Sequence, residues 1–154
     1  MPDPDIDSLR ALDPLILPEA LLKLIVADGP ARAELHVVGN NAGIVSLANV
    51  LRWLAAAERE ALHLHDLPFV WSTAAASLSV HRTEQAHEGR YGLLRRLETQ
   101  TAFAWLLDAT QLPRLADSLN LLAAMGGREG ARYDAPGVWD AVVYLRMDDT
   151  LDGA

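Results

Sequence analysis

The chain contains no cysteine, and this absence excludes disulfide bonds, thiolate zinc sites and cysteine nucleophiles together. It also lacks any run of about 18 apolar residues free of charges and helix breakers, which a membrane-spanning helix requires. Lysine is scarce, since Lys23 is the only one beside twelve arginines. With 51% hydrophobic residues, the chain must be stabilised mainly by the packing of its apolar side chains.

A basic start followed by an apolar run is also missing, because the first 30 residues include Asp3, Asp5, Asp7 and Asp13. We therefore expect no secretory signal and predict a cytoplasmic location. The formal net charge of −8 comes mostly from the ends, where residues 1–13 hold four acids and one base and residues 148–154 hold three acids and no base. An acidic chain of this kind is not expected to bind nucleic acid or a membrane.

The length of 154 residues fits one domain. Residues 1–18 contain four prolines among aspartates, a composition that neither a helix nor an interior strand tolerates. The predicted organisation is a flexible arm over 1–18, a single domain over 19–147 and an acidic tail over 148–154. We find no internal repeat in the sequence.

In the first half of the chain, apolar residues near 20–26 and alternation over 33–38 predict two strands, joined after Asp28 as a hairpin. A helix should follow over residues 42–58, with Asn40 or Asn41 as its N-cap. The glycines around this helix start also fit an anion site. A glycine-assisted turn is the preferred interpretation, because the lysine and the spaced glycines of phosphate-binding loops are absent.

In the second half, short strands are expected within 62–70 and near 77–82, followed by a hairpin formed by 91–97 and 101–108. A second helix should begin near Asp108 to Thr110, because Thr110 can cap it, and should end at Gly126-Gly127, before a last strand over 138–147. This order predicts an α+β fold. We expect an antiparallel or mixed sheet of about six to seven strands, with two helices packed on one face.

His63 and His65 stand two apart in an expected strand, so they can point to the same side and begin a metal site. The candidates for further ligands are Asp66, His81 and His87. A catalytic zinc needs about three protein ligands, and the spacing fixes only two, so an exposed strand face is the preferred interpretation. A metal-dependent enzyme that uses His63 and His65 stays as an alternative.

Trp71 follows Pro68 and precedes a run of small residues, which makes it a candidate for an exposed aromatic anchor in a protein interface. The other tryptophans fit better as packing residues. Polar and aromatic groups expected outside the core form the candidate partner-binding set, which is His63, His65, Trp71, His81, Arg95 and Arg96.

The segments ELHVVGNNAGIVSLANVLRWLAAAE, LHLHDL, YGLLRRL and TAFAWLLDATQLPRLADSLNLLA resemble a family of bacterial immunity proteins from polymorphic toxin systems. The matching positions, within residues 33–124, are Gly39, Gly43, Ile44, Leu47, Ala48, Trp105, Leu115 and Ala116. This resemblance implies a non-catalytic protein, without a cofactor, that binds and neutralises a cognate toxin encoded beside it. A second alternative to a toxin-binding protein is a small-ligand or structural module. Such a module would have a closed apolar pocket or would form a homodimer through an outer strand.

Overall fold

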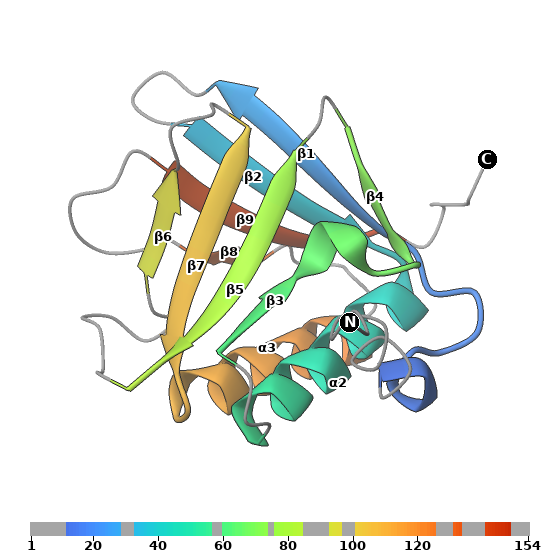
Figure 1. Cartoon of the computed structure of the whole chain (residues 1–154). Coiled ribbons are helices and arrows are strands. Elements are labelled where there is room, and N and C mark those ends of the chain that lie inside the picture. Colours follow the sequence, from blue (N-terminus) through green and yellow to red (C-terminus); the bar gives the residue numbers. More distant parts are fainter. Residues whose placement is uncertain are drawn as a thin grey trace, which may run out of the picture.

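The computed structural model of the chain describes residues 12–28, 33–56, 60–73, 76–84, 93–96, 101–125, 131–133 and 141–148 (Figure 1). Its elements are η1 (Asp13–Leu15), β1 (Leu22–Asp28), β2 (Ala33–Gly39), α2 (Asn41–Ala56), β3 (Ala61–His63), η2 (Leu64–Asp66), β4 (Val70–Ser72), β5 (Ser77–Thr83), β6 (Leu93–Arg96), β7 (Ala102–Asp108), α3 (Gln111–Ala124), β8 (Ala131–Tyr133) and β9 (Ala141–Met147). None of the helices in these ranges has the length and apolar character needed to cross a bilayer.

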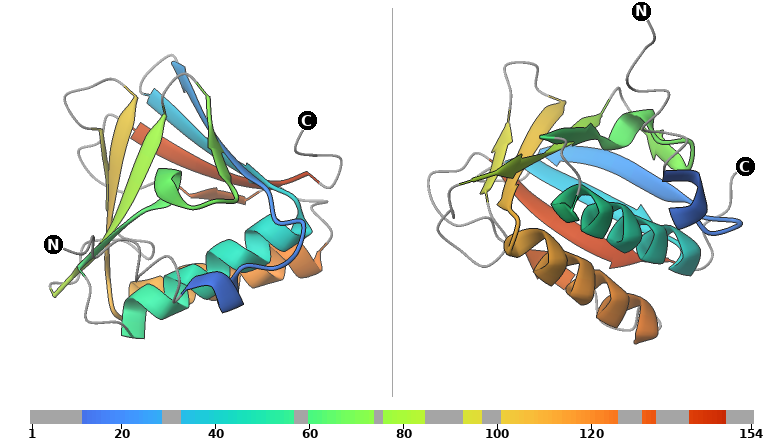
Figure 2. Two further views of the ribbon diagram at one scale, coloured as in Figure 1. Left: turned by 45° about the vertical axis from the view of Figure 1, so that its right-hand side comes forward. Right: turned by 60° about the horizontal axis from the view of Figure 1, so that its bottom comes forward.

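The described strands form two sheets. Sheet A has the order β4-β1-β2-β9-β8, and sheet B has the order β3-β5-β7-β6. The sheets face each other at an angle, and α2 and α3 lie side by side across the wide end between them (Figure 2). The α+β class, the mixed pairing and the two helices are confirmed. The strands divide between two sheets instead of forming one, which lets the inner face of each sheet contact a shared core.

The predicted hairpin between the first two strands is confirmed, and the helix after it begins at Asn41, one residue before the predicted start. Asn40 is the residue that caps this helix. Its Oδ1 accepts hydrogen bonds from the N–H of Gly43 at 2.7 Å and of Leu21 at 3.1 Å. Asn41 instead donates through Nδ2 to the carbonyl oxygen of Ala123 at 3.1 Å, which ties the start of α2 to the end of α3.

Gly43 is required by a close backbone contact. A Cβ at this position would overlap the carbonyl oxygen and carbon of Leu21, which is backbone and cannot rotate away. The same carbonyl accepts the N–H of Asn40 at 3.1 Å. The start of α2 is therefore filled by the chain itself, and the glycine serves a structural turn, in line with the preferred interpretation of this junction.

The second helix begins at Gln111, with Thr110 at the N-cap position as predicted, but the side chain of Thr110 makes no capping hydrogen bond and the side chain of Asp108 does. Asp108 Oδ1 accepts from the N–H of Thr110 at 2.8 Å and of Gln111 at 2.7 Å. Gln111 Oε1 in return accepts the N–H of Asp108 at 3.1 Å. This reciprocal capping box satisfies amides that have no partner inside the helix, and it explains why buried polar groups are tolerated at this position.

Contrary to the sequence-based expectation, the chain contains an internal repeat. Residues 34–56 align without a gap with residues 102–124, a shift of 68 positions that also matches the caps Asn40 and Asp108. The identical pairs are Leu47 and Leu115, Ala48 and Ala116, Leu51 and Leu119, Leu54 and Leu122, Ala55 and Ala123, and Ala56 and Ala124. The three leucine pairs are all buried. Each segment is a strand, a capped turn and a helix with the same core-facing positions.

The strand pairing repeats in the same way. The antiparallel hairpin β1–β2 corresponds to β6–β7, the parallel pair β2–β9 to β7–β5, and the antiparallel pair β3–β5 to β8–β9. Each half therefore contributes strands to the sheet of the other half. The domain consists of two similar halves with exchanged strands, in a pseudo-twofold arrangement that the sequence pattern alone did not predict.

Two features of the first half have no counterpart among the described residues of the second. One is β4, which pairs with the outer edge of β1. The other is the segment 12–17, which packs on α2. Its Leu12 is fully buried, Leu17 N–H donates to Ser46 Oγ at 2.8 Å, and Asn49 Nδ2 donates to the Leu15 carbonyl at 3.0 Å.

The boundaries predicted for the arm therefore need correction. Residues 12–18 were predicted to belong to a flexible arm, but residues 12–17 are part of the domain because apolar side chains of this segment contact the core. Residues 1–11 lie outside the described residues. At the other end, Asp148 N–H donates to the Gly39 carbonyl at 2.8 Å, and the rest of the predicted tail is outside the described ranges.

Candidate partner-binding surface

The segment 61–72 connects the two sheets, because β3 is an edge strand of sheet B and β4 is an edge strand of sheet A. The sequence predicted His63 and His65 on one face of a strand. Only His63 lies in a strand, whereas His65 lies in the 3-10 turn η2, so this prediction was wrong. The chain turns here because Leu64 and Leu67 are both buried in the core.

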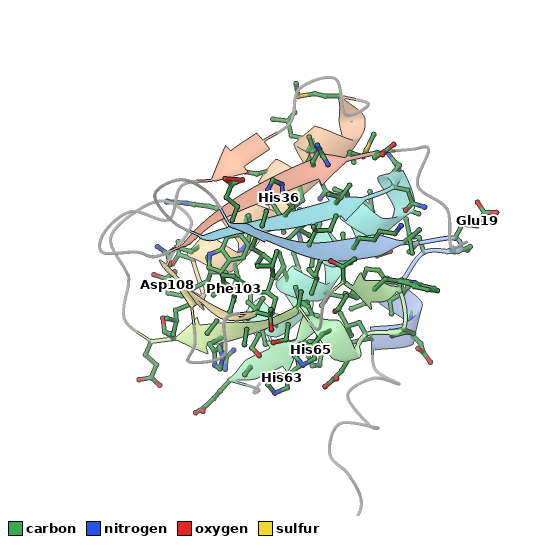
Figure 3. The ribbon with its side chains drawn as sticks, turned by 90° about the horizontal axis from the view of Figure 1, so that it is seen from above. Glu19, His36, His63, His65, Phe103 and Asp108 are labelled. Atoms are coloured by element: carbon green, nitrogen blue, oxygen red, sulfur yellow. The ribbon has the colours of Figure 1, made fainter. Side chains whose placement is uncertain are left out.

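The two imidazoles are nevertheless neighbours, with ring centroids 5.5 Å apart (Figure 3). Nδ1 of His63 is hydrogen-bonded to Ser79 Oγ at 2.7 Å, and Nε2 of His65 is 3.8 Å from Asp66 Oδ1. Nδ1 of His65 is buried and has no hydrogen-bond partner among the described residues. Within the described ranges, which do not include His87, no group of three or more His, Cys, Asp or Glu residues could hold a metal ion.

His81 lies in β5, next to this pair. Burial lowers the pKa of His81 below its usual value of 6.5, and charge repulsion from His63 lowers it further. His63 and His81 stand in neighbouring strands, where His63 is opposite Ser79 and His81 is opposite Ala61. This part of sheet B therefore disfavours the protonation of His81.

This lowered pKa predicts how stability changes with pH. The unfolded chain binds the proton more readily than the folded chain, so the free energy of unfolding should fall as the pH drops through 6.5 toward the folded pKa. Above 6.5 the contribution should be fully present. Chemical denaturation between about pH 8 and about pH 5 should give a flatter profile for His81→Gln than for the wild type. An equally steep profile in that variant would assign the pH dependence to other groups.

Trp71 is an exposed aromatic residue on a fixed backbone. Its side chain is 51% exposed, whereas its neighbour in the chain, Val70, is buried. β4 pairs in parallel with β1, and this register places Trp71 directly opposite Lys23. The expectation that Trp71 is exposed is thus met, and Trp105, at 3% exposed, packs in the core as predicted.

The register of sheet A extends this position into a row across four strands. Trp71 is opposite Lys23, Lys23 is opposite Val38, and Val38 is opposite Arg146. We call these four residues the Trp71 row, in which Val38, between the two cations, is only 2% exposed. Lys23 and Arg146 were missed in the sequence analysis. Alternation within each strand indicates that they face outward, but only the sheet order brings them together with Trp71.

The six residues of the predicted partner-binding set do not form one surface. His63 and His81 are in sheet B, His65 is in η2, and Trp71 is in sheet A. Arg95 and Arg96 lie in β6, the edge strand of sheet B opposite to β3, at positions paired with Ala104 and Phe103. Trp71 therefore lies on an edge strand of sheet A, and the arginines lie on the edge strand of sheet B that is farthest from β3.

Between the helices and the sheets lies a cavity of about 10 Å³, which is about the volume that one water molecule needs. Its lining is wholly apolar and combines corresponding residues of the two halves, such as Leu51 with Leu119 and Val37 with Trp105. The other lining residues are Leu47, Leu64, Leu78, Val80, Leu115 and Leu145. This cavity is a packing gap in the core and is too small for a metabolite.

The described surface therefore offers one exposed aromatic anchor with cations in its row, and a separate group of imidazoles on β3, η2 and β5. No family model, no curated protein and no solved structure matches the chain.

Proposed function

We propose that this chain is a non-catalytic cytoplasmic interaction protein that binds and neutralises a bacterial toxin. The observation that supports this most directly is the half-exposed side chain of Trp71 on a strand that is held by its pairing with β1. An exposed tryptophan on a fixed backbone offers a large contact area at a low cost in conformational entropy, and such residues dominate protein interfaces. The sequence resemblance described above supplies the class of partner.

The cavity between the helices and the sheets is too small to hold a metabolite. Pockets for small molecules usually enclose roughly 300 to 1,000 Å³, whereas the cavity between the helices and the sheets measures about 10 Å³. An interaction protein needs a rigid scaffold that presents a surface. The packed leucines of both halves provide such a scaffold.

The first test is neutralisation in cells. The protein encoded by the reading frame next to this chain should arrest bacterial growth when expressed alone, and co-expression of this chain should restore growth. The two proteins should also co-purify as a complex. Growth arrest that continues at full expression of this chain, or a neighbouring protein that is not toxic, would contradict the proposal.

The second test is Trp71→Ala. Loss of an interface anchor costs about 2 kcal/mol or more, so binding to the same partner should weaken by roughly 30-fold or more. The melting temperature should change little, because the side chain is 51% exposed. Leu121→Ala is the matched control, since Leu121 is also exposed but lies on α3. Equal binding by Trp71→Ala and wild type would exclude Trp71 as the anchor.

A further inference from the structure

The Trp71 row is cationic on an acidic molecule. Lys23 is half-buried and Arg146 is exposed, while the whole chain carries a formal charge of −8. Neither cation forms an ion pair with the described residues. On the same sheet, Oε1 of Glu34 lies 3.0 Å from Nε2 of His36. Asp148 directly follows the end of β9. Among the described residues, no carboxylate therefore neutralises Lys23 or Arg146.

The internal repeat shows that this row is specific to the first half. The positions of sheet B that correspond to Lys23, Val38 and Arg146 are Leu93, Leu106 and His81, which pair with one another in the same register. Apart from His81, whose pKa is lowered, these are apolar residues. Trp71 itself belongs to β4, which has no counterpart in the described part of the second half. Two similar scaffolds thus differ by an added aromatic residue and two added cations.

We infer that the Trp71 row binds an acidic patch on the protein partner, an inference that rests on the proposed function. Trp71 would bury its ring against apolar atoms of the partner, while Lys23 and Arg146 would pair with its carboxylates. Rim charges of this kind accelerate association and select the partner through complementary potentials. A protein patch fits better than nucleic acid, because two cations on an acidic chain cannot neutralise many phosphates.

The test uses charge reversal in the full chain. Binding to the product of the neighbouring reading frame should weaken roughly 10- to 100-fold for Lys23→Glu and for Arg146→Glu. It should also weaken as the salt concentration rises for the wild type, and less steeply for these variants. Arg114→Glu is the matched control. Arg114 is an exposed arginine on α3, and its reversal should change affinity by less than about threefold.

The outcomes separate the two proposals. If the wild type binds and both reversals bind equally well, the acidic-patch inference is wrong while the proposed function stands. If the wild type does not bind, both fail. Binding that disappears after nuclease treatment would assign the row to nucleic acid and overturn the inference. Lys23→Gln and Arg146→Gln remove each charge without reversing it. They should weaken binding less than the glutamate variants do, with the same ranking of the two positions. They keep the inference testable even if a glutamate disturbs folding.

Discussion

Leu51→Ala and Leu119→Ala should each lower the free energy of unfolding by about 2 to 5 kcal/mol, and by similar amounts. The two leucines occupy corresponding positions in α2 and α3, are at most 1% exposed, and line the same apolar cavity. Each truncation removes buried methyl groups and enlarges a gap that the surrounding side chains only partly fill. Urea denaturation of both variants with the wild-type protein gives the comparison.

Leu121→Ala provides the control on the same helix, because Leu121 is 62% exposed and should cost less than about 0.5 kcal/mol. If Leu119→Ala is as mild as Leu121→Ala, the core does not lie between the helices and the sheets as described. A large difference between Leu51→Ala and Leu119→Ala would instead show that the two halves are packed unequally around the cavity.

Gly43→Ala should lower the free energy of unfolding by about 1 to 3 kcal/mol, although alanine is the better helix former. The added Cβ would overlap the backbone carbonyl of Leu21, so the link into β1 or the start of α2 must move. Gly39→Ala should cost less. Its Cβ would lie 2.7 Å from the Cδ1 of Leu22, a methyl group at the end of a side chain. Thermal melting that ranks the two variants in the reverse order would contradict this account.

Elements encoded within about 20 residues were predictable from the sequence. Alternation around Leu35 and Val37 marks β2, and the asparagines after Gly39 mark the start of α2 within one residue. Thr110 stands at the N-cap of α3 as predicted, but the side chain that makes the capping hydrogen bonds was not identified, because Thr110 and Asp108 are both good caps. The choice depends on Gln111, whose side chain reaches back to the Asp108 amide.

The division into two sheets was not predictable from local patterns. The parallel pairs β2–β9 and β5–β7 join segments from different parts of the chain, and no alternation within a strand specifies its neighbour. The sequence indicated the turn at His65 only in part, through Pro68, which interrupts a long strand. Its position is set by the burial of Leu64 and Leu67, which depends on the opposite sheet.

Local sequence patterns also do not show which surface residues come together. Exposure of Trp71 could be predicted from its flanking residues, because Pro68 and the small residues after Trp71 interrupt regular packing. The association of Trp71 with Lys23 and Arg146 could not, because these three residues come from β4, β1 and β9. The cluster of His63, His65 and His81 was only partly foreseen, since the turn η2 changes the geometry of the pair.

The exchange of strands between the halves also determines the order in which the strands of sheet A can pair during protein synthesis. β2 pairs on one side with β1 as soon as both leave the ribosome, but its other neighbour, β9, begins 108 positions later, with Ala33 opposite Ala141. Until then β2 has an open hydrogen-bonding edge, and unpaired edges of nascent chains promote aggregation. Sheet A can close only after β9 has been translated, so this parallel pairing should form later than the local hairpin of β1 and β2.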